Sequence, residues 1–217
     1  MEGGPVYKKK NLWRVDNKDL AKIRECINSG LSGKYSSLFE KKAAKKFKRK
    51  YAIGLNSGTS ALHVALFAVG IKRGDEVIVP PLTFSATAFS VLYLNAKPVF
   101  ADVDINTFNI SPEQIEKKIT NKTKAIMVPN LIGNIPNWRD IKKIAKKNKL
   151  KIIEDAAHAL GSKYKNGKKV GSCCYSDMTV FSFHPVKIIA GGEGGIITTN
   201  SNQYYQKLLA LRTHGIT

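Results

Sequence analysis

The sequence predicts an α/β fold with three layers, in which a mostly parallel central sheet is covered by helices on both faces. From Tyr51 onward, short apolar runs alternate with amphipathic stretches, which is the pattern of strands connected by crossover helices. The chain has 217 residues, enough for one sizeable core, and 43% of them are hydrophobic, which is ordinary for a globular protein. One core is the simplest interpretation.

Two helices are expected before the alternating region. Residues 17–29 place apolar side chains at roughly helical spacing, and Gly30 follows where a left-handed cap would lie. Residues 36–50 place apolar side chains on one side and lysines on the other. We expect residues 1–50 to form an N-terminal helical segment that packs on a domain formed by residues 51–217.

The alternating region is expected to form strands and helices in turn. The expected strands cover residues 51–55, 76–79, 98–101, 125–128 and 151–154, and the intervening helices cover 61–69, 86–94, a segment after Ser111-Pro112, and 138–147. Two further strands, 178–183 and 195–199, and a helix over 203–211 are expected after these. Ligands of such sheets bind at the carboxyl ends of the strands.

Charge is the unusual feature of the composition. The formal net charge is +20, which would suit nucleic acid, an anionic membrane surface or phosphate-bearing small molecules. However, 30 of the 36 basic residues are lysines in short dispersed groups, a pattern typical of solvated helix faces. Three cysteines without CxxC spacing indicate neither disulfides nor a metal site, and no leader or membrane span is visible. We expect a cytoplasmic protein without nucleic-acid or membrane partners.

The first candidate site is a small polar turn, residues 56–62, between an expected strand and an expected helix. Backbone N–H groups at a helix N-terminus bind anions, and the hydroxyls of Ser57 and Thr59 would point at the same ligand. The turn therefore favours a phosphate site. The alternative is an ordinary N-cap, in which Thr59 or Ser60 satisfies the first turn.

The second candidate site lies at the end of the expected strand 151–154, where Glu154 and Asp155 follow an apolar run. A buried Asp155 would need a cationic partner, because desolvation of an unpaired carboxylate is costly, and a protonated pyridine nitrogen is one such partner. The alternatives are an N-cap or surface carboxylate for Asp155 and a satisfied core histidine for His158.

The third candidate site is residues 181–195, in which Lys187 lies between an aromatic, apolar approach and four glycines. Burial among apolar groups would make this amine a usable nucleophile. The alternative is a solvated loop lysine before a glycine-rich turn.

Together these segments resemble the DegT/DnrJ/EryC1/StrS family of sugar aminotransferases, which are enzymes of fold type I that depend on pyridoxal 5'-phosphate (PLP). The resemblance implies the large domain of an aspartate aminotransferase-like, PLP-dependent transferase. The matching segments run in order over nearly the whole chain: Gly4-Pro5, Phe39-Glu40, 57–62, 74–80, Thr83-Phe84, 97–100, 102–104, 154–159, 181–195 and 212–215.

The resemblance also implies a role for each matching site residue. Lys187 would be the Schiff-base lysine, and Asp155 would hold the pyridine nitrogen protonated. Gly58, Thr59 and Ser182 would hold the phosphate, next to Ser57 in the same turn, and Phe84 would stack on the ring. His158 would contact the 3-hydroxyl group, at a position where most family members have glutamine.

The reaction and partners that the resemblance implies are those of a homodimeric transaminase. It would transfer an amino group from glutamate to the C4 keto group of a nucleotide-linked deoxysugar, for a cell-surface glycan or flagellin sugar. The segments around His158 and Lys187 look most like the branch of pseudaminic-acid biosynthesis, which acts on a UDP-linked 4-keto-6-deoxy-hexosamine. Family members add a smaller C-terminal domain, which we expect this chain to lack. A truncated, catalytically inactive PLP-binding or structural homologue remains the alternative.

Overall fold

The computed structural model describes residues 15–29 and 33–215, and it contains all the helices and strands that the sequence predicts, with small differences in their bounds. The expected cap at Gly30 and the matching segment Gly4-Pro5 lie outside the described residues. The helices are α1 (Asn17–Asn28), α2 (Lys34–Phe47), α3 (Gly58–Ala68), α4 (Ala86–Leu92), α5 (Pro112–Lys118), α6 (Trp138–Lys147) and α7 (Asn202–Arg212), with a short 3₁₀ turn η1 (Leu131–Gly133). The strands are β1 (Tyr51–Leu55), β2 (Glu76–Val79), β3 (Lys97–Phe100), β4 (Thr123–Pro129), β5 (Lys151–Asp155), β6 (Met178–Ser182) and β7 (Gly195–Thr199).

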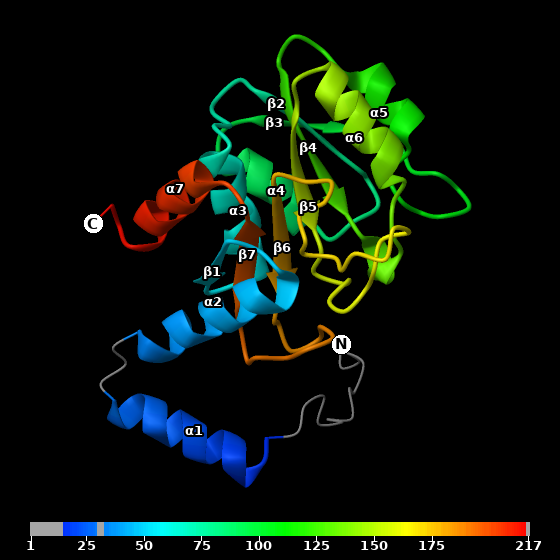
Figure 1. Ribbon diagram of the computed structural model, residues 1–217. Coiled ribbons are helices and arrows are strands. Elements are labelled where there is room, and N and C mark those ends of the chain that lie inside the picture. Colours follow the sequence, from blue (N-terminus) through cyan, green and yellow to red (C-terminus); the bar gives the residue numbers. More distant parts are fainter. Residues whose placement is uncertain (1–14, 30–32, 216–217) are drawn as a thin grey trace, which may run out of the picture.

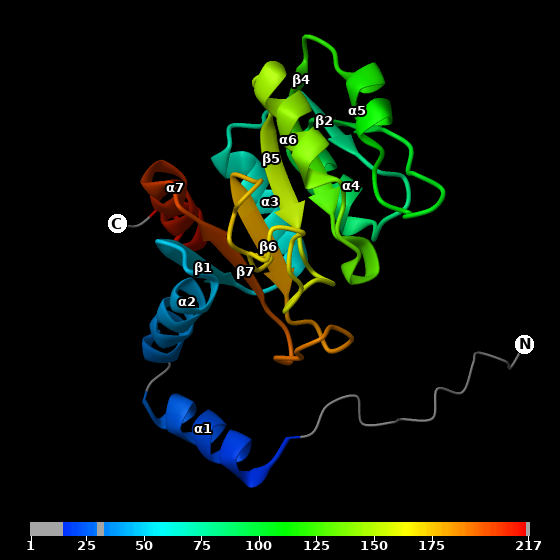
Figure 2. The same cartoon turned by 45° about the vertical axis from the view of Figure 1, so that its right-hand side comes forward.

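The two N-terminal helices differ in how they pack. Helix α1 buries none of its residues and lies apart from the other elements in Figures 1 and 2. Helix α2 buries Ala43 and Phe47 and lies next to β1. It ends before the predicted residue 50, because Lys48 adopts the left-handed conformation with φ of 55°. Glu40 connects α2 to β1 and α7, since it accepts hydrogen bonds from Gly54 N–H of β1 at 2.8 Å and from Arg212 of α7.

The predicted three-layer α/β fold with a mostly parallel sheet is confirmed. The strand order is β1-β7-β6-β5-β4-β2-β3, and β7 runs antiparallel to both of its neighbours while the other paired strands are parallel. The reversal of β7 was not predicted. It arises because the segment between β6 and β7 contains no helix in the structure, and a parallel pair usually requires a helical crossover.

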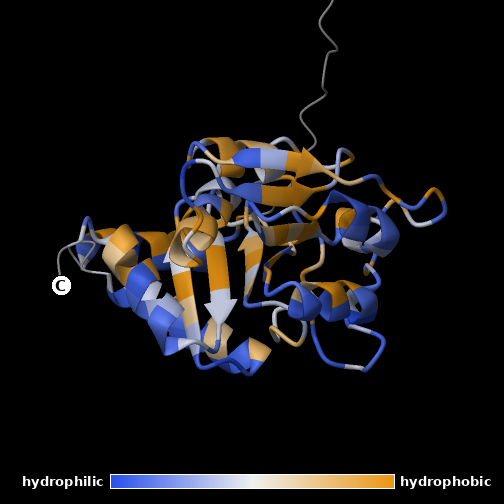
Figure 3. Ribbon diagram, turned by 90° about the horizontal axis from the view of Figure 1, so that it is seen from above, coloured by the Kyte–Doolittle hydropathy of each residue, from blue (hydrophilic) through white to orange (hydrophobic). Residues whose placement is uncertain are grey.

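Each face of the sheet carries its own apolar cluster. On one face, α3, α4 and α7 cover residues that include Ile153 of β5, and on the other, α2 and α6 cover residues that include Ile152. Figure 3 shows the strands coloured mainly as hydrophobic between helices whose outer sides are hydrophilic. Because side chains alternate along a strand, the neighbouring carboxylates Glu154 and Asp155 point to opposite faces.

The parallel strands end at one edge of the sheet, and the segments that follow them meet there. The turn after β1, the segment after β2, the end of β4, the end of β5 and the loop after β6 all contribute to one cavity at this edge. No helix among the described residues is long and apolar enough to cross a membrane.

Candidate active site

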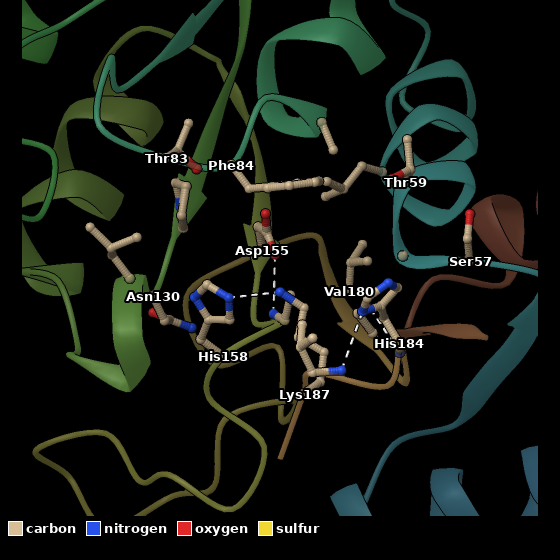
Figure 4. Close-up of a pocket in the computed structure, with 18 of the residues that line it drawn as sticks. Ser57, Thr59, Thr83, Phe84, Asn130, Asp155, His158, Val180, His184 and Lys187 are labelled. Carbon is tan, nitrogen blue, oxygen red and sulfur yellow. Dashed lines mark hydrogen bonds between the residues drawn. The ribbon is translucent and has the colours of Figure 1, made fainter. Parts of the chain in front are cut away.

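A cavity of about 210 Å³ lies at the carboxyl ends of the strands. A cavity of about 150 Å³ lined by apolar side chains can already hold a benzene ring, so this space suits a ligand of aromatic-ring size. Figure 4 shows how its side chains converge from different elements. All eight site residues that the sequence singles out line it: Ser57, Gly58, Thr59, Phe84, Asp155, His158, Ser182 and Lys187.

The polar turn after β1 forms the N-terminus of α3. Ser57 is the N-cap, and its Oγ accepts a hydrogen bond from Ser60 N–H at 3.0 Å, so Ser57 rather than Thr59 or Ser60 caps the helix. The N–H groups of Gly58 and Thr59 belong to the first turn, which has no intrahelical acceptors, and they remain available to an anion. The capping and anion-binding interpretations are therefore compatible.

Close packing of this turn against β6 and β7 depends on two glycines. A Cβ atom at Gly58 would lie 2.8 Å from Cβ of Ser182, and one at Gly195 would lie 2.3 Å from the carbonyl oxygen of Ser57. Contacts of this kind leave no room for a side chain. The glycines bring the hydroxyl-bearing Ser182 next to the N-terminus of α3, and both belong to the same end of the cavity.

Asp155 ends β5 and is buried, with 8% of its surface exposed. Its carboxylate accepts one close hydrogen bond, from Ala157 N–H at 3.0 Å, and a long one from Thr87 Oγ1 at 3.5 Å. Burial raises the pKa of Asp155, although the Ala157 N–H group and the charges of His158 and Lys187 oppose that shift. A carboxylate has about four acceptor positions, so most of its capacity is left for a ligand.

Lys187 lies on the loop after β6, and its Nζ is 2.7 Å from Nε2 of His158. The same Nζ lies 5.7 Å from the centroid of the Phe84 ring, which is itself 65% exposed at the cavity. Burial, followed by the charge of Lys187, lowers the pKa of His158, so its ring is neutral near neutral pH. An amine, an imidazole and an aromatic face thus meet above the Asp155 carboxylate.

The loop that carries Lys187 is stabilised by hydrogen bonds within the loop and by a contact with α2. Lys187 N–H donates to the carbonyl oxygen of His184 at 2.9 Å, and Phe183 N–H donates to that of Gly194 at 2.8 Å. Nε2 of His184 lies 3.6 Å from Oε1 of Glu193, and the Phe183 ring contacts Phe39 of α2 edge to face. These contacts hold Lys187 over the cavity although the loop contains no regular secondary structure.

Several cavity residues were given no individual role by the sequence. They include Thr83, Asn130, Leu131, His184 and Glu193. Their positions in loops carry no periodic signal. His184 and Glu193 lie within the predicted segment 181–195, and Thr83 lies within the matching segment Thr83-Phe84, but no pattern indicated that their side chains line the cavity. Among residues 15–29 and 33–215, no group of three or more His, Cys, Asp or Glu side chains could hold a metal ion, and the three cysteines are free.

Comparison with known proteins identifies relatives over nearly the whole chain. Residues 14–217 match the sequence profile of the DegT/DnrJ/EryC1/StrS aminotransferase family. GDP-perosamine synthase of Escherichia coli O157:H7 is 42% identical over 98% of this chain and 57% of its own length. The chain spans about half the length of the curated relatives it matches.

Solved structures agree with the sequence match. The aminotransferase of Psychrobacter cryohalolentis superimposes with a TM-score of 0.88 at 40% identity, covering 93% of this chain and 52% of that one. NtdA of Bacillus subtilis, solved with the bound cofactor PMP, superimposes with a TM-score of 0.81 at 33% identity, covering 90% and 45%. The resemblance that the sequence motifs indicated is confirmed at the level of family and fold.

Proposed function

Since this chain belongs to the DegT/DnrJ/EryC1/StrS aminotransferase family, we propose that it holds PLP and forms the active-site part of a nucleotide-sugar aminotransferase. The observation that carries the proposal is the incompletely paired Asp155, buried in the same cavity as the Lys187 amine. A buried carboxylate that the chain does not satisfy needs a cationic ligand, and a protonated ring nitrogen supplies one.

The residues at the cavity fit PLP from end to end. Gly58, Thr59 and Ser182 offer N–H and hydroxyl groups for the phosphate, and Ser57 shapes that turn. Phe84 would stack on the ring, and His158 would contact the 3-hydroxyl group. Asp155 would pair with the ring nitrogen, and Lys187 would bind the cofactor covalently through Nζ.

When bound, PLP supplies an electron sink for the bonds of the reacting carbon. The chain's own residues would do the rest. Asp155 keeps the ring nitrogen protonated, Lys187 Nζ moves a proton to and from the reacting carbon once it is released, and the first turn of α3 fixes the phosphate. None of these three roles requires a metal ion.

The substrates we propose are glutamate, as amino donor, and the C4 keto group of a nucleotide-linked deoxysugar used in cell-surface glycan or flagellin biosynthesis. The motifs around His158 and Lys187 favour a UDP-linked sugar, whereas a relative is named for GDP-perosamine. Incubation of the purified protein with UDP- and GDP-linked 4-keto sugars would identify the nucleotide.

We also propose that the active protein is a cytoplasmic homodimer. Its support is the exposed apolar surface beside the cavity, where Val186, Ile188 and Ile189 are more than half exposed. Light scattering on the purified protein would measure the mass of the assembly. A monomer at micromolar concentration that still binds PLP fully would contradict this part of the proposal.

The experiment that tests the proposed function combines spectroscopy with chemical trapping. Purified protein is mixed with PLP, its visible absorption is recorded before and after glutamate, and borohydride followed by peptide mass spectrometry locates the label. We expect an absorption band that glutamate bleaches, with the label on Lys187. Lys187→Ala should abolish both, whereas Lys165→Ala, at an exposed position outside the cavity, should retain them.

Two other outcomes would change the proposal. Label spread over surface lysines, unchanged in Lys187→Ala, would reject the site. A specific band on Lys187 that glutamate does not bleach would favour the alternative of a catalytically inactive PLP-binding homologue.

A further inference from the structure

Two polar residues of the cavity have no part in holding PLP in the proposed arrangement. They are His184 and Glu193, at the two ends of the loop that carries Lys187. Their side chains are 47% and 59% exposed, and Nε2 of His184 lies 3.6 Å from Oε1 of Glu193. Figure 4 shows His184 and His158 on opposite sides of Lys187. This pair therefore lies beside the amine, on the side that His158 does not occupy.

The other polar side chains of the cavity are already engaged. The amide of Asn130 donates to Glu154 at 2.9 Å and accepts from Trp138 Nε1 at 3.2 Å. The hydroxyl group of Thr83 lies 2.9 Å from that of Thr87. The proposed function assigns the following side chains to the cofactor or to the turn that binds its phosphate: Ser57, Thr59, Asp155, His158, Ser182 and Lys187. The pair at the loop ends is therefore available to a second ligand.

Both members of the pair keep hydrogen-bonding capacity. Nδ1 of His184 accepts a hydrogen bond from Val186 N–H at 3.3 Å, so the ring presents its hydrogen on Nε2. The 3.6 Å between this nitrogen and the Glu193 carboxylate exceeds the usual length of a direct hydrogen bond. The pair thus places an N–H donor next to a carboxylate acceptor. A hydroxyl group matches both, because it can donate to the carboxylate and accept from the N–H group at once.

Backbone hydrogen bonds hold the two ends of the loop together without help from these side chains. Phe183 N–H donates to the carbonyl oxygen of Gly194 at 2.8 Å, and Gly191 N–H donates to that of Phe183 at 2.8 Å. Phe183 precedes His184, and Gly194 follows Glu193, so both residues are fixed by their neighbours. We therefore expect a substitution that keeps the shape of Glu193 to leave the loop in place.

The chemistry of the two proposed substrates decides which of them suits the pair. The keto carbon of the sugar must come within reach of Lys187 Nζ, and a sugar ring carries polar substituents on the carbons beside it. The pair lies on the same loop as Lys187, at the same cavity. Glutamate has two carboxylates instead, and the negative charge of Glu193 repels them. The pair therefore favours the sugar over the amino donor.

We propose that His184 and Glu193 form a hydroxyl-binding subsite for the acceptor sugar, next to its reacting carbon. The inference rests on the proposed function and deepens it by naming residues that determine specificity. The subsite contacts the sugar when the amino group is delivered and makes no contact with the amino donor. It also selects a sugar that has a hydroxyl group close to the keto carbon over an analogue that lacks this group.

The first test measures binding of sugars that cannot react. Titration calorimetry of the purified protein compares UDP-N-acetylglucosamine with UDP, and GDP-mannose with GDP, because these sugars have a hydroxyl group in place of the C4 keto group. The ratio of the two dissociation constants within each pair isolates the contacts to the sugar. We expect Glu193→Gln to reduce the preference for the sugar-linked nucleotide roughly three- to tenfold, the effect of one hydrogen bond, and to leave the affinity for the free nucleotide unchanged.

The second test compares the two half-reactions. Glutamate bleaches the PLP band, and a UDP- or GDP-linked 4-keto sugar then restores it. For Glu193→Gln we expect the half-saturating concentration of the sugar to rise roughly three- to tenfold, while that of glutamate does not rise. Glu113→Gln is the matched control, because Glu113 is an exposed residue of α5 that does not line the cavity, and it should change neither value.

Two results would overturn the inference. One is a wild-type protein that shows no preference for a sugar-linked nucleotide, or a preference that Glu193→Gln does not reduce. The other is a Glu193→Gln variant in which trapping of PLP on Lys187 falls and both half-reactions slow equally. That pattern would mean that Glu193 only holds the loop in place.

These readouts separate the inference from the proposed function. If the calorimetric preference depends on Glu193 but PLP is never trapped on Lys187, the sugar subsite stands and the proposed function fails. If PLP is trapped on Lys187 and both half-reactions proceed with the same half-saturating concentrations in wild type and Glu193→Gln, the proposed function stands and the inference fails.

Discussion

Glu154 and Asp155 are adjacent, buried carboxylates on one strand, yet the protein treats them differently. Glu154, with no exposed surface, accepts hydrogen bonds from four side chains at 2.7–3.3 Å: Asn130, Tyr164, Ser176 and Thr179. Asp155 receives one close bond from the backbone and one long bond from Thr87. A carboxylate that the chain satisfies completely stabilises the fold, whereas one left incomplete at a cavity is available to a ligand.

The residues around the two carboxylates differ in the same way: those around Glu154 are structural, and those around Asp155 can titrate. Around Glu154, aromatic rings of Trp138, Tyr164 and Tyr175 contact one another and close the α6 side of the sheet. Burial raises the pKa of Tyr164, and the adjacent Glu154 raises it further, so this hydroxyl remains a donor. Around Asp155 lie the titratable side chains of His158 and Lys187 instead.

The largest effect is expected for Asp155→Asn, measured as the rate at which glutamate bleaches the PLP band. Without the carboxylate the ring nitrogen loses its proton, and we expect a decrease of about 100- to 1,000-fold, the usual effect of removing one preorganised electrostatic group. The midpoint of thermal unfolding without PLP should not fall. A variant that kept the wild-type rate would mean that Asp155 does not hold the cofactor.

The reverse pattern is expected for Glu154→Ala. Removal of this carboxylate leaves the donors of Asn130, Tyr164 and Thr179 buried without an acceptor, which should lower the free energy of unfolding by about 3–5 kcal/mol. Urea denaturation of Glu154→Ala and Asp155→Ala in parallel measures the difference between their free energies of unfolding. Equal losses for Glu154→Ala and Asp155→Ala would remove the distinction between a structural and a functional carboxylate.

The pH dependence of stability gives a smaller effect with a definite sign. Burial raises the pKa of Glu154 above its unfolded value, although its donors oppose that shift. Its contribution to stability is therefore fully present below the unfolded pKa near 4.3 and is lost as the pH rises through the folded pKa, by up to about 1.4 kcal/mol per pH unit. Glu154→Gln cannot titrate, so the stability of wild type relative to this variant should fall from about pH 4 toward neutral.

The outcome that would contradict this sign is a wild-type stability that rises relative to Glu154→Gln over the same range. It would mean that the four donors lower the pKa by more than burial raises it. Denaturation midpoints at closely spaced pH values, with equal denaturant slopes for both proteins, make the comparison valid.

The sequence predicted the surroundings of Asp155 much better than those of Glu154. Alternation of apolar runs located the strands. The family motifs singled out Asp155, which ends β5, and His158 and Lys187, which lie in the segments after β5 and β6. The donors to Glu154 come from residues 130, 164, 176 and 179, three of them in segments without periodicity. Their convergence depends on packing against α6, and no local pattern encodes it.

Backbone features were also beyond prediction from the sequence. The antiparallel β7 depends on a connection without a helix, and the sequence motifs located Lys187 without indicating its contact with His158. The N–H group of Ile132 reaches His158 only because a β-branched residue adopts a left-handed conformation, which its propensity disfavours. Such departures from local preference are expected where the surrounding structure holds a functional site.

The smallest expected effects come from one substitution made on each side of β5, Thr179→Val and Thr87→Val. Both threonines are fully buried, but Thr179 Oγ1 lies 2.7 Å from Glu154 and Thr87 Oγ1 lies 3.5 Å from Asp155. The change in shape is the same, and each substitution also removes a contact to a second hydroxyl, that of Ser176 at 3.2 Å for Thr179 and that of Thr83 at 2.9 Å for Thr87. The difference between the two variants therefore compares mainly the bonds to the two carboxylates. We expect Thr179→Val to lower the free energy of unfolding by about 1–2 kcal/mol. Thr87→Val should lower it by less, because its bond to Asp155 is long and the Thr83 hydroxyl that it leaves lies at the cavity. If PLP is added, only Thr87→Val should alter its affinity, since only Asp155 faces the cavity.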